Sequence, residues 1–545
     1  MRTTRGSGVG TGLLVTAMVT AALIGILYFG WTVIGLPFAP FDVFDYSTRV
    51  LPGRVIAFGI HTMVAVIHGL HLGPTATTAK TAEQAMGIIG LFFTGLVAGM
   101  ILYEVIRASR GRYAVGLGLA FGLVLAVPVA LISHHAGRTA TTPPTANALW
   151  LMTVFLLWGL VIGRVSRRLI PAAAPVQERG EFAPSLERID RRRFLIRLAG
   201  STAAITVVGA VVGDLAEANH RKTMLAALPR ELWSATHPLP NADASVKPVP
   251  GTRPEFTPLE RHYRIDINTI PPTINEQQWR LNVTGLVEKP LALTLDDLRS
   301  YDPLHQFITL ACISNPVGGD LIGTTRWTGV SLQRLLPALR LKPGASRLKL
   351  HAADGFFEVV PIETIKADER VMLTYAWDGV PLLPGHGFPL RIYIPNVYGM
   401  KQPKWINAIE VTDHWEPGFW VARGWNKVAE MKATSVIDVV GMDMDIVQAG
   451  QSKMIVPIGG IAHAGARGIS KVELQVDEGR WRPALLRSPL SGLTWVLWRY
   501  DWPFQHGKHT FTVRCYDGQG NPQIVTPTPP EPDGATGLFS KTEML

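Results

Sequence analysis

The stretch Thr309-Leu-Ala-Cys312-Ile-Ser-Asn315-Pro-Val-Gly-Gly-Asp320 carries the most informative pattern in this chain. One cysteine follows directly on a short apolar run typical of a β-strand and begins a loop rich in glycine, asparagine and proline. Further along, the apolar pattern that ends near Leu336 suggests a helix. Functional residues often occupy such loops between rigid elements. The cysteine could be a nucleophile, a small core residue or a single soft ligand to a metal that brings its other ligands, and spacing alone leaves these alternatives open.

The loop resembles the molybdenum-ligand loop of the sulfite-oxidase-like molybdopterin oxidoreductases, in which one cysteine thiolate binds a molybdenum held by a pterin. Other blocks of sequence resemble the same family and occur in the family's order between Pro254 and Gln523. These blocks are Tyr263-Arg264-Ile-Asp266, Trp279–Pro290, Ala353–Phe356, Leu383–Arg391 and Asn396–Trp405. Several blocks in one order make the resemblance specific.

The resemblance implies the fold of sulfite oxidase, a bound Mo-molybdopterin and a set of site residues. Cys312 would be the metal ligand and the catalytic residue. A pterin with a phosphate tail needs cations and backbone donors, and several matched residues stand beside glycine or proline in loop-like positions. The residues that the family match makes cofactor-binding are Cys312 itself and Tyr263, Arg264, Asn315, His386, Arg391, Lys401 and Lys404.

One departure from the family pattern concerns the substrate. Family members that oxidise sulfite carry an arginine shortly after the ligand cysteine, in a loop of the type Cys-x-Gly-x-x-Arg. Here the first cation after Cys312 is Arg326. An anionic substrate needs fixed positive groups, so sulfite is in doubt, and reduction of a sulfoxide or N-oxide is the rival reaction.

Length and composition predict several domains, some of them in a membrane. The chain has 545 residues, 47% of them hydrophobic, with the apolar residues concentrated in the first two hundred positions. The net charge of +10 comes with arginines that flank apolar runs, which favours membrane orientation over nucleic-acid binding. Two cysteines without zinc-type spacing leave the redox compartment open.

Six apolar runs approach the length of a membrane span and predict an all-α transmembrane bundle. They are Gly12–Ile34, Val55–Leu72, Met86–Ile106, Tyr113–Ile132, Ala148–Val165 and Phe194–Val212. With the N-terminus outside, inner loops hold thirteen Lys and Arg residues and the outer side holds six. Cytoplasmic loops carry the excess, so we expect both ends of this six-span domain outside, although the basic residues Arg2 and Arg5 argue against it.

A basic segment before the last span, Asp190-Arg191-Arg192-Arg193-Phe194, resembles a twin-arginine export signal. The plain alternative is a basic flank of a membrane helix. A domain that is loaded with its cofactor before export favours the export signal. Ala216-Glu-Ala218 could be a cleavage site, but retention of the anchor is the favoured interpretation.

Histidines near the ends of the expected spans raise the question of haem. His61 and His68 lie seven residues apart and therefore on one face of the second run, with His71, His134 and His135 expected at the same boundary. They could bind haem or another metal and relay electrons between the molybdenum and a quinone pool. Histidines bonded to backbone or lipid headgroups are favoured instead, because the sequence shows no pairing of ligands.

The remaining pattern divides the chain into domains. Residues 1–170 form the membrane domain, 171–220 a linker with the last span, 221–253 an extracytoplasmic linker and 254–430 the catalytic domain, where alternating runs and short helices predict an α+β fold. Residues 431–526 resemble the family's immunoglobulin-like dimerisation domain, a β-sandwich with Cys515 in its core, and 527–545 look like a disordered tail.

The sequence thus predicts a membrane-anchored, extracytoplasmic molybdopterin oxidoreductase that performs two-electron oxygen-atom transfer. Its expected partners are the lipid bilayer, a small-molecule substrate, an electron-transfer partner or quinone pool, and a second copy bound through the C-terminal domain; nucleic acid is not expected. The alternative is a cofactor-free scaffold that binds a partner at the membrane surface.

Overall fold

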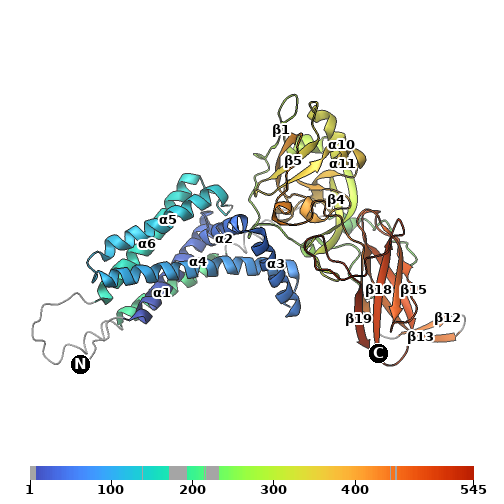
Figure 1. Ribbon diagram of the computed structural model, residues 1–545, viewed down its shortest axis with the longest axis horizontal. Helices are drawn as coiled ribbons and strands as arrows, with labels where there is room; N and C mark the ends of the chain where they lie inside the picture. The colour runs from blue at the N-terminus through green and yellow to red at the C-terminus, as the bar shows by residue number, and fades with distance from the viewer. Residues whose placement is uncertain are drawn as a thin grey trace, which may run out of the picture. The chain divides into compact units, whose positions relative to one another are not determined.

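The computed structural model describes residues 8–70, 72–137, 139–170, 193–213, 215, 232–441, 444–448 and 451–545. The chain forms two compact units (Figure 1). The first contains Met1–Leu51, Lys80–Ala227 and Ile267–Thr273. The second contains Pro52–Ala79, Leu228–Asp266 and Ile274–Leu545. Each unit therefore includes a short segment whose neighbours in sequence belong to the other unit.

The first unit is helical, because its sequence is apolar over long runs. Its helices are α1 (Val9–Phe29), η1 (Gly30–Ile34), α2 (Ala39–Val50), α4 (Thr75–Ala108, first turn in the second unit), α5 (Ala114–Ala136), α6 (Pro144–Leu169) and Arg193–Gly213. Small residues let α5 and α6 approach closely, since a Cβ at Gly159 would lie 2.0 Å from the carbonyl oxygen of Gly118. The two helices run side by side in Figure 1.

The structure corrects the number of expected spans from six to five in the described residues. The run Val55–Leu72 folds as α3 (Gly53–Gly69), a helix of 17 residues. At 1.5 Å per residue such a helix is about 25 Å long, shorter than the roughly 30 Å core of a bilayer. It clusters with the second unit. The other five runs correspond to helices long and apolar enough to cross a membrane.

One mixed sheet, one antiparallel sheet and short helices build the first domain of the second unit, which confirms the expected α+β pattern. One sheet has the order β2-β1-β10-β5-β6 and the other β3-β4-β7-β8, with β9 paired to β7. The strands are β1 (Leu281–Gly285), β2 (Leu291–Leu293), β3 (Leu304–Ala311), β4 (Ile322–Ser331), β5 (Arg347–Ala352), β6 (Phe357–Pro361), β7 (Met372–Trp377), β8 (Val380–Pro381), β9 (Arg391–Tyr393) and β10 (Ile406–Thr412). The helices are α8 (Trp233–Thr236), α9 (Leu295–Arg299), α10 (Leu332–Leu335) and α11 (Ile362–Ala367), with the 3-10 turns η2 (Leu259–Arg261), η3 (Leu336–Leu339), η4 (Pro384–His386), η5 (Gly399–Lys401) and η6 (Val421–Arg423).

The cysteine loop joins β3 to β4. The antiparallel pair ends at Ala311 opposite Ile322, and the Cys312 amide donates to the Leu321 carbonyl over 2.9 Å. The apolar pattern after the loop, expected to be a helix, is the strand β4 up to Ser331, and α10 takes only four residues. Buried neighbours on both faces of β4 make its pattern continuous instead of alternating, which a short sequence window does not distinguish from a helix.

The C-terminal domain packs two antiparallel sheets over one core. One sheet contains β11 (Thr434–Val440), β12 (Met444–Gln448), β13 (Gln451–His463), β16 (Leu485–Leu486) and β17 (Val496–Pro503). The other contains β14 (Ile469–Val476), β15 (Arg482–Pro483), β18 (Lys508–Asp517) and β19 (Phe539–Met544). Cys515 is fully buried in the shared core, as expected, and its thiol is free. The immunoglobulin-like topology stays a prediction.

The expected disordered tail is wrong. β19 pairs with β18 from Phe539 opposite Val513 to Met544 opposite Lys508, beside it in Figure 1. The proline- and glycine-rich composition ends at Gly537, and the six residues of β19 then alternate between partly buried and exposed positions, as an edge strand does.

The predicted connector before the catalytic domain can be compared with the structure, whereas the predicted export signal cannot. The connector before the catalytic domain has no strand from 232 to 258, but it is held in place: Arg487 donates from Nε to Glu255 Oε2 over 2.9 Å. Several predicted features lie outside the described residues: the twin-arginine segment up to Arg192, the cleavage site Ala216–Ala218, the linker 171–184 and His71. The side chains of His61 and His68 also lie outside them.

Candidate active site

Cys312 directly follows the last residue of β3, and the residue is buried, with 8% of its surface exposed. Burial raises the pKa of the thiol, and hydrogen bonds from Ser314 and the charge of Lys404 oppose this effect. Without a further positive charge the sulfur is therefore held as a thiol, which is a poor nucleophile. Binding to a metal removes the proton from such a group.

Asn315 closes the loop around this cysteine. Its Oδ1 accepts from the Leu321 amide over 2.9 Å, and its own amide donates to the Cys312 carbonyl over 3.1 Å. Asn315 thus fixes the direction of the cysteine from both ends of the loop. This gives the residue a positioning role that the family match alone did not specify.

Four rings form an aromatic box beside the cysteine loop: His262, Trp327, Trp377 and His386. His386 lies 4.4 Å from Trp377 and 5.7 Å from His262, and the two indole rings are 5.6 Å apart, measured between ring centroids. Burial lowers the pKa of His262 to about 4 and that of His386 well below its usual value. Both imidazoles are therefore neutral at pH 7.

The aromatic box contains polar atoms without partners. His262 Nε2, Trp327 Nε1 and Trp377 Nε1 are buried and make no hydrogen bond to any described residue. Buried polar groups are normally paired, and each unpaired group costs free energy. Three such atoms around one place indicate that a polar molecule belongs there.

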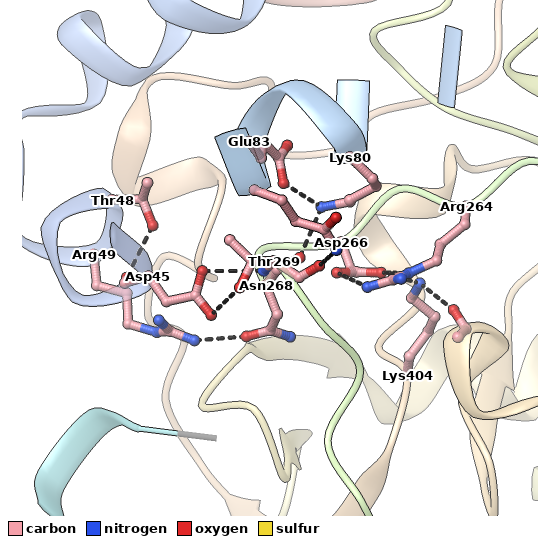
Figure 2. Close-up of polar contacts among 12 residues, drawn as sticks. Asp45, Thr48, Arg49, Lys80, Glu83, Arg264, Asp266, Asn268, Thr269 and Lys404 are labelled. Carbon is pink, nitrogen blue, oxygen red and sulfur yellow. Dashed lines mark hydrogen bonds and ion pairs between the residues drawn. The ribbon is translucent and has the colours of Figure 1, made fainter. Parts of the chain in front are cut away.

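Three cations and one carboxylate lie next to the box. Arg264 donates to Asp266 through Nε and Nη2 over 2.8 and 3.2 Å, and Lys404 Nζ donates to the same carboxylate over 3.0 Å, as Figure 2 shows. Arg391 is 4% exposed, donates to the His386 carbonyl over 3.1 Å and lies 4.9 Å from the Trp327 ring. Arg264, Arg391 and Lys404 all lower the pKa of His386, which places the three positive charges around that ring.

Burial disfavours the charged forms of two of these cations, Lys404 and Arg391. It lowers the pKa of Lys404 to about 8 and that of Arg391 to about 10. A shared Asp266 carboxylate offsets only part of the positive charge. An anionic group with several oxygens, such as the phosphate of a pterin cofactor, would complete the cluster.

Two phenols face the cysteine. Burial raises the pKa of Tyr263 well above its usual value and that of Tyr398 to about 12, and Cys312 in its thiolate form acts in the same direction on both. The phenols are therefore neutral hydrogen-bond donors over the working pH range. Tyr398 also accepts from the Lys432 amide over 3.1 Å.

The structure brings most of the predicted residues together. The site contains Tyr263, Arg264, Cys312, His386, Arg391 and Lys404, and Asn315 lies in the cysteine loop. Lys401 instead forms an ion pair of 2.6 Å with Glu358, whose side chain is fully buried. The geometry thus gives Lys401 a counterion of its own, and its cofactor-binding role stays a prediction.

Four site residues were not predicted. His262 stands next to the matched Tyr263, Tyr398 lies inside a matched block and Trp327 follows Arg326, the first cation after Cys312, so their positions carried a signal. Trp377 has no such signal, because it reaches the site through the pairing of β7 with β4. No group of three or more His, Cys, Asp or Glu residues suited to a bare metal ion occurs in the part of the chain described. A metal at Cys312 would therefore depend on ligands from an organic cofactor.

Comparison with known proteins gives a family match and several relatives. Residues 268–420 match the oxidoreductase molybdopterin binding domain. The chain is 32% identical over 149 residues to the uncharacterized oxidoreductase YuiH of Bacillus subtilis, covering 27% of this chain and 73% of YuiH. It is 29% identical over 153 residues to the putative protein-methionine-sulfoxide reductase subunit YedZ1 of Azospira oryzae, covering 28% and 56% of the two chains.

Human mitochondrial sulfite oxidase is 26% identical over 290 residues, covering 45% of this chain and 52% of that protein. The chain thus spans about half the length of the YedZ1 and sulfite oxidase relatives. Among solved structures, the sulfane dehydrogenase SoxCD of Paracoccus pantotrophus aligns with 19% identity and a TM-score of 0.46, over 59% of this chain and 92% of that one.

Proposed function

We propose a reaction for this chain from the premise that it belongs to the family of oxidoreductases with a molybdopterin-binding domain. The proposal is the two-electron reduction of a neutral S- or N-oxide. In this reaction the bond from sulfur or nitrogen to oxygen breaks, two electrons and two protons are taken up, and the reduced compound and water are released. A reduced carrier in the membrane, such as a quinol, would supply the electrons.

The site residues fit the molybdopterin cofactor. Cys312 would be the protein ligand of the metal, since a thiolate is a soft, anionic donor. The cations Lys404, Arg391 and Arg264 would bind the phosphate, and the three unpaired nitrogen atoms of the aromatic box would find partners on the pterin. When bound, the molybdenum supplies oxygen-atom exchange coupled to two electrons.

The observation that favours a neutral substrate is that, among the described residues, the cation acting on the Cys312 thiol and the first cation after Cys312 in sequence both have partners already. Lys404 is the cation that acts on the Cys312 thiol, and it is already paired with Asp266. Arg326, the first cation after the cysteine, lies 4.8 Å from the Trp233 ring, and Asp378 is the charge that acts on it. Sulfite would need positive groups that are free to bind it.

The neutral phenol of Tyr263 suits such a substrate. Because its pKa is raised, the hydroxyl keeps its proton and can donate a hydrogen bond to the oxygen of a sulfoxide or N-oxide. The same hydroxyl is well placed to hold a proton near the oxygen that leaves. The similarity to the putative protein-methionine-sulfoxide reductase subunit YedZ1 supports this choice of substrate class.

Five spans also change the proposed topology. The segment Pro52–Ala79 belongs to the second unit, which contains the catalytic domain and is called the catalytic unit below. An even number of spans separates this segment from the residues after Gly213, so both can lie on the same side of the membrane. Relative to the six-span count, Arg2 and Arg5 move to the inner side and Arg49 and Arg54 to the outer side. The inner side still holds thirteen basic residues and the outer side six. This excess on the inner side favours an outside catalytic domain and a cytoplasmic N-terminus.

Metal analysis and a paired redox assay test the proposed function. Purified full-length protein should contain near-stoichiometric molybdenum and, with a reduced viologen as donor, should reduce methionine sulfoxide or a small N-oxide. With ferricyanide as acceptor it should not oxidise sulfite. Sulfite oxidation without oxide reduction would overturn the assignment, and folded protein without molybdenum or pterin would support the scaffold alternative.

A further inference from the structure

The segment Pro52–Ala79 is an insertion from the helical part of the sequence into the catalytic unit. It contains α3, a loop and the first turn of α4. At its beginning it lies against η6, since a Cβ at Gly53 would come within 2.6 Å of the Arg423 carbonyl oxygen. At its end it reaches the cysteine loop. Both ends of the insertion are therefore held by the catalytic domain.

The contact with the cysteine loop is both polar and apolar. Asp320 Oδ2, in the loop, accepts from the amide of Thr75, the first residue of α4, over 2.8 Å. One residue on, Ala76 packs with Cys312 and Leu321 in a single buried cluster. Thr75 and Ala76 are 2% and 8% exposed. A carboxylate at the first turn of a helix is favourable, so Asp320 fixes this turn over the cysteine.

We propose that the first turn of α4 forms a wall of the substrate pocket and that Ala76 limits the size of the group that can approach the Cys312 sulfur. The inference rests on the proposed function for the nature of the substrate, but the wall itself rests only on contacts within the catalytic unit. Tyr263 packs against the same cluster as Ala76 and Cys312. The side chain at position 76 therefore shares the space around the sulfur with the phenol proposed to bind the substrate oxygen.

The chemistry of position 76 makes it suited to this role. Alanine is the smallest side chain that keeps a helix intact, so it leaves room above the sulfur without weakening α4. One added or removed methyl group in an apolar pocket changes the preference between substrates by about tenfold or more. Ala79 lies in the same turn and is 2% exposed, but it is not part of the cluster at Cys312, which makes it a matched control.

Thiol labelling in cofactor-free, full-length Cys515→Ser protein tests the wall without any turnover. Ala76→Gly and Asp320→Asn should each raise the rate at which a bulky maleimide modifies Cys312 several-fold, with a smaller effect on iodoacetamide. Ala79→Gly removes the same methyl group from the same turn and should leave both rates unchanged. Equal rates for Ala76→Gly, Asp320→Asn and the parent, or equal acceleration by Ala79→Gly, would overturn the proposal.

Turnover of the molybdenum-loaded protein then separates the wall from the reaction. Ala76→Gly should raise kcat/KM for a bulky aryl sulfoxide relative to dimethyl sulfoxide by about tenfold, the low end for one methyl group. An unchanged ratio in an active enzyme would refute Ala76 as the limit on size. Absence of oxide reduction in the parent enzyme would instead refute the proposed reaction, while the labelling experiment would still decide whether the wall exists.

Discussion

Lys404→Met should stabilise the cofactor-free protein and, at the same time, abolish retention of the pterin. Burial lowers the pKa of Lys404 from 10.5 to about 8 in spite of its bond to Asp266. The difference corresponds to a cost of roughly 3 kcal/mol for keeping the lysine charged in the folded protein at pH 7. Methionine has a similar apolar stem without the charge. Asp266 keeps its two bonds to Arg264 in the variant.

The lowered pKa of Lys404 also determines how the stability of the parent protein changes with pH. Between about pH 8 and 10.5 the unfolded chain binds the Lys404 proton and the folded chain does not, so the stability of the parent protein rises with pH over this window. Below about pH 8 both states bind the proton, and the cost is constant. Lys404→Met lacks this rise.

Chemical unfolding of the cofactor-free, full-length protein in detergent, followed by tryptophan fluorescence, measures both effects. Trp405 is a local reporter, because Lys404 Nζ lies 4.7 Å from its ring. At pH 7 the variant should exceed the parent by up to about 3 kcal/mol, and at pH 9.5 the two should lie closer together.

Lys401→Met is the matched control. This lysine is also buried, but its removal leaves the fully buried Glu358 without its partner at 2.6 Å. Breaking a buried pair in this way costs about 3–5 kcal/mol, so this variant should be less stable than the parent. If Lys404→Met were destabilised as much as Lys401→Met, or if it kept the parent's rise with pH, the assignment of Lys404 to an unfilled anion site would be refuted.

Three further predictions concern other parts of the chain. His262→Gln should flatten the loss of cofactor-free stability between about pH 6.5 and 4, because the pKa of His262 is lowered to about 4 and only the unfolded chain binds its proton in that window; acid unfolding curves check this. Reporters fused after Gly213 should read as exported and those after Arg168 as cytoplasmic, and the opposite pattern would exclude an outside catalytic domain. A reduced-minus-oxidised spectrum of the full-length protein should show no haem, whereas a Soret shift lost in His68→Ala would make the anchor an electron conduit.

Local pattern and order of motifs predicted most of the catalytic domain. Short alternating patterns such as that of β5, and short helical patterns such as that of α9, are set within a few residues and predicted an α+β domain. The run Val55–Leu72 failed as a span because hydropathy measures composition and not what covers the helix. Trp377 and the insertion at Ala76 depend on packing between segments that are distant in sequence, which no local pattern contains.

Within the site, the sequence predicted residues but not their pairing. Lys401 and Lys404 stand three residues apart in one matched block and look equivalent there. In the fold, Lys401 meets Glu358 from β6, and Lys404 meets Asp266 from the segment before β1. One lysine therefore has its own buried counterion and the other shares a carboxylate. This difference depends on tertiary packing and is not contained in the local sequence.

Molybdenum K-edge absorption of the parent protein and of Cys312→Ser tests the central claim, that the Cys312 sulfur binds a pterin-held molybdenum. We expect near-stoichiometric molybdenum in the parent and one sulfur ligand fewer in Cys312→Ser. Cys312→Ser should also retain much of its pterin and lose nearly all turnover, with Cys515→Ser like the parent. An unchanged sulfur count in Cys312→Ser, or full turnover by that variant, would contradict the claim.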